Sequence, residues 1–397
     1  MRDEERWTVA GDQWPDGGRS HGGCVLSVWR FGPVMRRLLP TACCLLLSTG
    51  IQAQQPRISN ARLQARQVAA GLEREVRSIA DDASGPAWIG YTVPAVPGEH
   101  HLCCSESAVI AGVRQTCDGC RLEGGAGTTG LGPAIGGPVM LEGARKILVM
   151  LRVENRRTEK VRTFSEDCDL DAGGLPVHWL EGVRAPDSVA FLRSLVRTTV
   201  EEKPERTEEG RISRGALTAI AFHADASAGG ALEEFVLVQN PLWLRKQAAF
   251  WLGSTRGQEG FAVLRRLVQE DSSVPFRREA VFAISVSKAP EATDTLMQVA
   301  RHDTSAEVRA QALFWLAQKA GARVAGTITD AIANDPDTQV KERAVFALSQ
   351  LPKDEGVPLL IEVARTNKNP VVRKRAVFWL GQSKDPRALA FIEQVLR

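Results

Sequence analysis

Alanine recurs at intervals of 32 residues through the C-terminal half of this 397-residue chain. The register holds without a slip over six copies, which are Ala216, Ala248, Ala280, Ala312, Ala344 and Ala376. The segments around the last two copies, 340–364 and 372–396, align position by position. Self-similarity at a fixed period of this kind is the signature of a solenoid, in which like units stack on one another. The repeat therefore decides the fold of about half of the chain.

Each 32-residue unit is expected to be a pair of helices. We number the positions of a unit from the residue equivalent to Val372, which is position 0. Position 0 is apolar, position 4 is the alanine and position 8 is Leu or Ile, so all three lie on one helical stripe. A polar turn follows, and then a second apolar-periodic run such as Leu389, Ile392 and Val395. A lone helix pair cannot bury such stripes, so stacking must supply the core.

The pattern VRxxAxxxLG, followed by DP or GVP at the start of the second helix, resembles HEAT-type repeats. The similarity is to the short bacterial class first described in phycobilin lyases. It covers residues 211–397, and the apolar run 186–196 matches the second helix of the last unit. The resemblance implies an α-solenoid of about six to seven repeats over residues 181–397. The expected fold class is α+β multidomain, with this all-α solenoid preceded by a small, mostly β domain.

Two aromatic positions of the unit supply the candidate partner-binding residues. Position 6 is phenylalanine in five units: Phe250, Phe282, Phe314, Phe346 and Phe378. Helix geometry places this column off the core stripe, so it either packs between neighbouring first helices or forms an apolar strip for a partner. Position 7 alternates between tryptophan, at Trp251, Trp315 and Trp379, and alanine. Complementary packing and an aromatic ligand groove are the two interpretations of this alternation.

A basic residue occupies position 1 in five units: Arg245, Arg277, Arg309, Lys341 and Arg373. These cations either pair with groups of the adjacent turn, for which Asp303, Asp337 and Asn369 are candidates, or bind an acidic partner. The sequence stops at Arg397 without a polar cap on the last helix. We therefore expect a partner, or self-association with a second copy, to cover the last repeat.

The segment 35–53 has the three parts of a secretory signal peptide: a basic start, a short apolar middle and small residues before the cut. Cleavage is predicted between Ala53 and Gln54. The apolar middle is shorter than the roughly 20 residues that a membrane-spanning helix needs. Residues 1–34 are polar and glycine-rich, and they are interpreted as a non-native or disordered extension. The expected location is periplasmic or secreted, with no membrane span.

Residues 54–180 are expected to form the small β domain, which contains cysteines. Alternating apolar and polar residues predict a strand at 61–66, and a short helix is predicted at 71–82. A further strand is predicted at 88–93, and residues 147–165 predict a hairpin.

Histidines and cysteines gather in one part of this domain: His100, His101, Cys103, Cys104, Cys117 and Cys120, with Cys168 as an odd fifth cysteine. In an oxidising compartment, disulfides among Cys103, Cys104, Cys117 and Cys120 are the favoured interpretation. Thiolate and imidazole ligation of a metal by these six His and Cys residues is an alternative. Redox chemistry of the motif Cys117-Asp118-Gly119-Cys120 is another.

The composition and motifs favour a binding protein over an enzyme. The formal net charge of +3 is too small, and the basic residues too evenly spread, for a nucleic-acid partner. HEAT arrays that hydroxylate deoxyhypusine hold iron with His-Glu pairs, and this chain contains no His-Glu dipeptide. We expect a non-catalytic, cofactor-free scaffold for a protein or peptide. The alternative is a thiol-redox or metal-binding role through Cys117 and Cys120.

Overall fold

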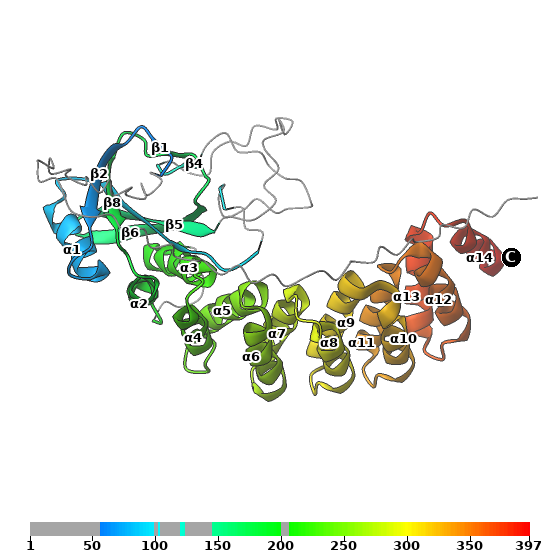
Figure 1. The fold of residues 1–397 in the computed structure, drawn as a ribbon. Coiled ribbons are helices and arrows are strands. Elements are labelled where there is room, and N and C mark those ends of the chain that lie inside the picture. The colour runs from blue at the N-terminus through cyan, green and yellow to red at the C-terminus, as the bar shows by residue number, and fades with distance from the viewer. Residues whose placement is uncertain (1–55, 99–101, 104–119, 124–144, 200–205) are drawn as a thin grey trace, which may run out of the picture. The chain divides into compact units, whose positions relative to one another are not determined.

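The computed structural model describes residues 56–98, 102–103, 120–123, 145–199 and 206–397 (Figure 1). A small β region over residues 58–181 is followed by paired helices that run to Leu396, as the sequence predicts. Residues 55–397 form one compact unit, because the sheet and the first helices share a hydrophobic core. The described residues do not include the predicted extension 1–34, the predicted signal peptide 35–53 or its predicted cleavage site.

The β region is built on a five-stranded mixed sheet in the order β2-β8-β3-β5-β6. Strand β8 is parallel to both β2 and β3, whereas β3-β5 and β5-β6 are antiparallel pairs. The strands are β2 Arg62–Gln67, β3 Ala87–Pro94, β5 Lys146–Glu154, β6 Arg157–Ser165 and β8 Pro176–Glu181. Three two-residue strands form a second sheet: β1 Ile58–Ser59, β7 Leu170–Asp171 and β4 Cys120–Arg121.

The predicted strands at 61–66 and 88–93 and the predicted hairpin correspond to β2, β3 and β5-β6. In the hairpin turn, Asn155 and Arg156 both have positive φ, as a tight two-residue turn between twisted strands requires. The sequence did not predict that β8 would lie between β2 and β3, because this pairing joins segments far apart in the chain.

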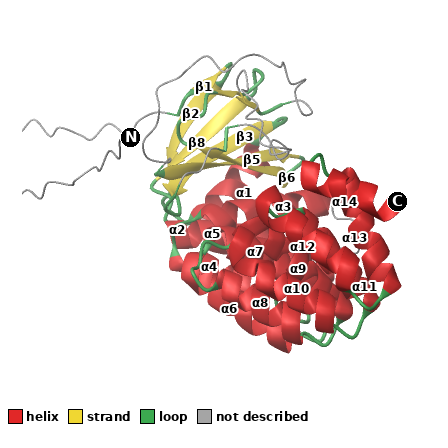
Figure 2. Ribbon diagram, turned by 90° about the vertical axis from the view of Figure 1, so that its right-hand side faces the viewer, coloured by secondary structure: helices red, strands yellow, loops and turns green. Residues whose placement is uncertain are grey.

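Alternate residues of the central strands enter two different cores. Ile89 and Tyr91 face the helices α1 (Leu72–Asp82), α2 (Ala185–Leu195) and α3 (Glu208–Phe222), which cover one face of the sheet (Figures 1 and 2). Trp88 faces the other side, where a smaller core includes Met150 and Trp179. Both faces of β3 and β5 are therefore buried, which explains why these strands read as nearly continuous apolar runs.

The helices that follow form six pairs in chain order (Figure 1). The first helices are α3, α5 Leu242–Thr255, α7 Val274–Val286, α9 Ala306–Ala320, α11 Thr338–Ser349 and α13 Pro370–Gln382. The second helices are α4 Ala226–Phe235, α6 Gly257–Glu270, α8 Ala292–His302, α10 Ala325–Asn334, α12 Lys353–Thr366 and α14 Pro386–Leu396. A 3-10 turn, η2 (Gly321–Val324), joins α9 to α10. Helix α2 precedes the pairs as an additional second-type helix and contacts α4.

The apolar stripe at positions 0, 4 and 8 is buried in every unit. All six repeat alanines are fully buried, and the residues at positions 0 and 8 from α5 to α13 are at most 2% exposed. Each first helix from α3 to α11 packs on the first helix of the next unit, and each second helix from α4 to α12 packs on the first helix that follows it. Stacking of neighbours thus supplies the core, as the periodicity predicts.

Buried ion pairs join consecutive units. Arg245 pairs with Asp271, Arg277 with Asp303 at 2.9 Å and Arg309 with Asp335 at 2.7 Å. Each arginine comes from position 1 of one unit, and each aspartate lies in the turn before the next first helix. The same aspartate accepts a backbone N–H two residues later, for example that of Ser305 on Asp303. The basic column is therefore used inside the array, and pairing with the adjacent turn is the interpretation that holds.

The partners differ from the predicted ones in two units. Arg309 binds Asp335 and not Asp337, because the Asp337 carboxylate accepts the N–H of Gln339 as the N-cap of α11. Arg373 donates to the carbonyl oxygen of Asn367 rather than to Asn369, whose side chain caps α13. The predicted acceptors are thus helix caps, and the residue two positions earlier faces the preceding unit.

Candidate binding surface

Aromatic rings from positions 6 and 7 of successive first helices, together with Phe222 at the end of α3, form one continuous series, which we call the aromatic ladder. Phe250 stacks on Phe282 with ring centroids 5.8 Å apart, and Phe314 stacks on Phe346 at 6.0 Å. Edge-on and tilted contacts through tryptophans complete the series. Its members are Phe222, Trp251, Phe250, Phe282, Trp315, Phe314, Phe346, Trp379 and Phe378.

The alternation at position 7 produces this arrangement. Where position 7 is an alanine, as at Ala283 and Ala347, the phenylalanine beside it stacks on the phenylalanine of the preceding unit. Where it is a tryptophan, as at Trp315, the indole contacts the preceding phenylalanine instead, at 4.8 Å from Phe282. The alternation of tryptophan and alanine at position 7 repeats every two units, which is every 64 residues. Large and small residues in alternate units therefore fit together, as the packing interpretation of this 64-residue pattern requires.

The rings of the ladder from α5 to α13 are nevertheless not removed from solvent. They are partly exposed, and Phe378 is 49% exposed. The two interpretations of position 6 therefore describe one surface, because the rings pack between neighbouring first helices and still present an apolar strip. Such a strip on first helices is the kind of surface that marks an interaction site.

Charged side chains at positions 2 and 3 border the ladder. Lys246, Arg278, Glu279 and Gln311 surround Phe282 and Trp315 in a hollow of about 280 Å³, which Pro275 completes. Burial raises the pKa of the Glu279 carboxyl, although the neighbouring cations Lys246 and Arg278 act in the opposite direction. The hollow is therefore lined by two aromatic rings together with positively and negatively charged side chains.

Some of the bordering charges are paired and others are not. Arg278 pairs with Glu307 at 3.2 Å, and Arg375 pairs with Glu342 at 3.1 Å. Among the described residues, three further cations of this border have neither an ion-pair nor a hydrogen-bond partner: Lys246, Arg343 and Lys374. The unpaired charge beside the ladder is therefore mainly positive.

Two tryptophans of the ladder also have unused hydrogen-bond donors. The indole Nε1 atoms of Trp315 and Trp379 are buried and have no acceptor within the part of the chain that the structure describes. A buried donor without an acceptor costs about 1–3 kcal/mol. The two lie two units apart, at equivalent positions of the 64-residue pattern.

The layer of second helices has a different surface. Exposed ion pairs connect its members, such as Arg266 with Glu233 at 3.2 Å and Arg323 with Asp294 at 2.7 Å. The phenylalanines of these second helices, Phe235, Phe261 and Phe391, are buried. Aromatic surface and unpaired charge are thus combined on the layer of first helices.

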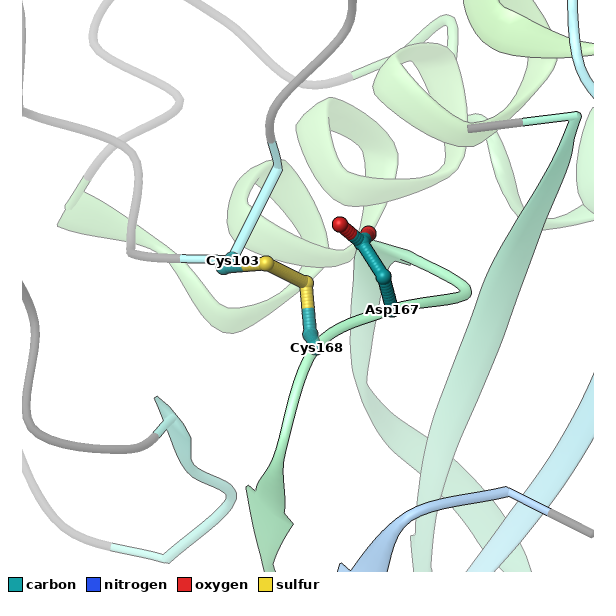
Figure 3. A group of neighbouring side chains, drawn as sticks. All are labelled: Cys103, Asp167 and Cys168. Carbon is teal, nitrogen blue, oxygen red and sulfur yellow. A yellow bond between two sulfur atoms is a disulfide. The ribbon is translucent and has the colours of Figure 1, made fainter. Parts of the chain in front are cut away.

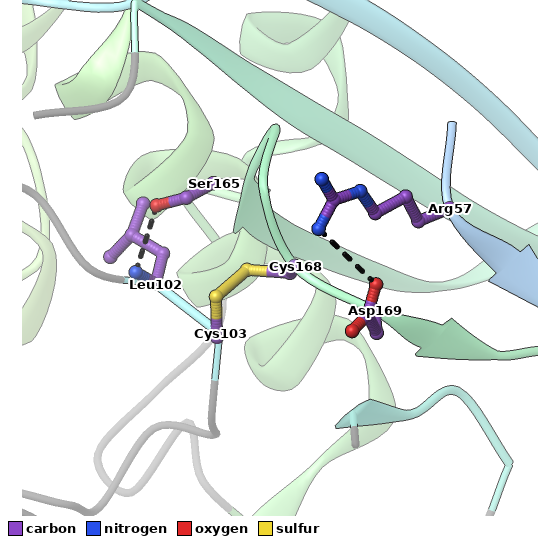
Figure 4. Close-up of a disulfide and its surroundings, with 6 residues drawn as sticks. All are labelled: Arg57, Leu102, Cys103, Ser165, Cys168 and Asp169. Carbon is purple, nitrogen blue, oxygen red and sulfur yellow. Dashed lines mark hydrogen bonds and ion pairs between the residues drawn. A yellow bond between two sulfur atoms is a disulfide. The ribbon is translucent and has the colours of Figure 1, made fainter. Parts of the chain in front are cut away.

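The structure places one disulfide in the β region, between Cys103 and Cys168, with their Cα atoms 5.0 Å apart (Figure 4). The N–H of Leu102 donates to Ser165 Oγ at 2.9 Å, and Arg57 pairs with Asp169, the residue after Cys168, at 3.8 Å (Figure 4). Cys168 is the partner because the turn after β6 carries it into the smaller core, 65 residues from Cys103. Sequence spacing does not reveal this pair.

The other members of the predicted cysteine and histidine group cannot be placed together. His100, His101, Cys104 and Cys117 lie outside the described residues, and only the backbone of Cys120 is described, in β4. The Asp167 carboxylate does lie beside the two bonded sulfurs (Figure 3). Because both sulfurs are used in the disulfide, neither is available as a thiolate ligand in this state.

A Ser-His pair lies between the sheet and the helices. Ser188 Oγ of α2 is 2.8 Å from His223 Nε2, and His223 Nδ1 donates to the Ala219 carbonyl oxygen at 2.6 Å. Tyr91 Oη of β3 is 2.8 Å from the same Ser188 oxygen. All three side chains are fully buried, and burial lowers the pKa of His223 to about 4. The group links β3, α2 and α3 inside the core, and sequence analysis missed it because its members are far apart in the chain.

These features define the class of the protein: an α-solenoid of helix pairs that continues from a small β region and carries a surface aromatic ladder. A family model described as HEAT repeats matches residues 231–317 and 327–397. The protein therefore carries a HEAT-like repeat array over this part of the chain. In the part of the chain that is described, no helix combines the length and the apolar character needed to cross a membrane.

Several solved structures resemble the chain at low identity. Human deoxyhypusine hydroxylase in complex with glycerol is 18% identical, with 52% of this chain and 90% of that chain covered and a TM-score of 0.27. Escherichia coli YibA is 20% identical over 53% and 79%, with a TM-score of 0.34. The CpcE–CpcF complex of phycocyanin lyase from Nostoc sp. PCC7120 is 17% identical over 51% and 77%, with a TM-score of 0.28. No curated protein sequence matches the chain.

Proposed function

We propose that this protein is an exported, non-catalytic scaffold that holds another protein or a peptide on the aromatic ladder. The HEAT-like array gives an extended surface built from equivalent helices. Export is proposed from the signal-peptide pattern at 35–53.

The contrast between the two helix layers carries the proposal. The second helices present exposed charges that pair with one another, whereas the first helices present partly exposed rings beside unpaired cations. Protein interfaces are enriched in aromatic residues and arginine and bury them at their centre. The layer of first helices therefore has the composition of an interface.

Site-specific photo-crosslinking in the native cells tests the binding surface. A photo-reactive residue replaces Gln311 or Arg343, both at position 3 of first helices, and Asp330 of α10 is the control position on the other layer. We expect specific protein adducts from the two ladder positions and none from Asp330. Equal labelling from all three positions would contradict the proposed surface.

Two chemical measurements test the other parts of the proposal. Amino-terminal sequencing of the exported protein is expected to begin at Gln54, and a start at Met1 would contradict processing. The alternative thiol-redox or metal-binding role requires Cys117 and Cys120 as a reducible pair or as metal ligands. Counting free thiols and analysing metal in exported protein decides between these states and an inert disulfide.

A further inference from the structure

We propose that the ladder binds an extended acidic segment of the partner, and that an apolar side chain of this segment enters the hollow that Phe282 and Trp315 line. This inference rests on the proposed function and specifies the chemistry of the partner. Two observations support it: the way the chain's own sheet uses the same helix face, and the unpaired charges beside the ladder.

In the first unit, the face equivalent to the ladder border is already occupied by the chain itself. Gly215 is at position 3 of α3, and a Cβ there would lie 2.3 Å from the carbonyl oxygen of Val161 in β6. The sheet can rest on this helix only because position 3 has no side chain. The layer of first helices is therefore continuous with an established intramolecular interface.

The later units present the same face with larger residues at position 3: Gln247, Glu279, Gln311, Arg343 and Arg375. These side chains prevent a whole sheet from approaching the helix backbone as it does at Gly215. A single extended segment needs less room and can lie along the rings between the polar side chains. The occupant that fits is therefore one strand of peptide rather than a domain face.

The unpaired positive charges beside the ladder favour a segment that carries negative charge. Lys246 lies in the hollow, and Arg343 and Lys374 continue the positive border along α11 and α13 without partners in the described structure. The one carboxylate of the hollow, Glu279, interacts electrostatically with Lys246 and Arg278, whose positive charges offset its own. Complementary charge across an interface increases both the rate of encounter and the selectivity for the partner.

Single-stranded nucleic acid also combines negative charge with rings that stack on aromatic side chains. We favour a peptide because few cations of the border lack partners among the described residues, whereas nucleic-acid sites cluster many Lys and Arg residues on one face. An oligonucleotide therefore belongs in the test as the competing occupant.

The test is to pan a displayed library of random 12-residue peptides on the full chain. We expect enriched sequences rich in Asp and Glu with an aromatic or aliphatic residue. A labelled peptide of this kind should bind the wild-type chain with an affinity that falls as salt rises. The R343E/K374E variant should bind it at least tenfold more weakly, as should W315A.

Matched changes on the second-helix layer, R266E/R323E, should leave the affinity unchanged, and thermal unfolding checks that each variant is folded. The inference is overturned if no acidic peptide is enriched, if R343E/K374E binds as tightly as the wild type, or if a 12-nucleotide oligo-dT binds more tightly than the peptide. If the ladder crosslinks to a protein in cells but fails these tests, the scaffold function stands and the acidic segment is wrong.

Discussion

Gly215 of α3 lies directly against Val161 of β6, so closely that a Cβ at position 215 would be 2.3 Å from the Val161 carbonyl oxygen. This contact is one of those that join the sheet to α3 within the compact unit of residues 55–397. At this end of the array the sheet rests on the first helix α3 through β6.

The first prediction follows from this contact. Gly215→Ala should lower the free energy of unfolding by about 1–3 kcal/mol, because the backbone of β6 must move to admit the methyl group. Gly230→Ala is the matched control, since Gly230 lies in α4 with nothing within 4 Å of an added Cβ. Alanine there should raise the free energy by up to about 1 kcal/mol through helix propensity. Urea denaturation measures both changes, and equal effects would mean that the close approach is unimportant.

The second prediction concerns the buried pair Arg309–Asp335. Asp335→Asn should cost about 3–5 kcal/mol, because it leaves a guanidinium buried without its counter-charge. In the next unit the equivalent positions hold Lys341 and Asn367, which cannot form an ion pair because the amide is uncharged. There the lysine donates to the Ala333 carbonyl oxygen, and Asn367 donates to that of Ile332.

The double variant Arg309→Lys/Asp335→Asn copies this arrangement and should therefore lose less stability than Asp335→Asn alone. A double-mutant cycle from urea unfolding gives the coupling between the two sites. Strictly additive losses would show that the pair contributes no interaction of its own.

The third prediction is a pH dependence that comes from His223. Burial lowers the pKa of this imidazole to about 4 in the folded protein, against about 6.5 in the unfolded chain. Between these values the unfolded chain binds more protons, so stability is fully present above pH 6.5 and is lost as the pH falls toward 4. The contribution lost at pH 5 is about 2 kcal/mol.

His223→Gln removes the titrating group while keeping a side chain that can donate and accept. The difference in unfolding free energy between pH 7 and pH 5 should be smaller for this variant than for the wild type, by about 2 kcal/mol. Equal pH dependence in the two proteins would show that His223 titrates near its ordinary pKa.

The sequence predicted those parts of the fold that depend on local spacing. The stripe at positions 0, 4 and 8 gave the helix pairs and their buried face, because helical periodicity is written in consecutive residues. Contacts between segments that are distant in the sequence could not be predicted in the same way. Cys168 could not be assigned to Cys103, nor Ser188 to His223, because three-dimensional folding alone brings these residues together.

The candidate binding surface could be predicted from the sequence only in part. Position 6 was recognised as a column from its spacing, but its linkage to position 7 depends on how neighbouring helices pack. Periodicity places Asp335 and Asp337 equally near the next unit, and the use of Asp337 as a helix cap decides which of them meets Arg309. Competing local hydrogen bonds therefore determined the partners that spacing alone left open.

The last prediction tests the alternation that builds the ladder. Ala347→Trp places a tryptophan at position 7 in consecutive first helices, where Phe314 and Phe346 now stack at 6.0 Å. The added indole must separate these rings, so the free energy of unfolding should fall by about 1–3 kcal/mol. Trp315→Ala is expected to cost about 3–5 kcal/mol, since it removes the ring that joins Phe282 to Phe314. Urea unfolding measures both effects, and a stable Ala347→Trp variant with unchanged near-ultraviolet circular dichroism would show that the alternation is not required for packing.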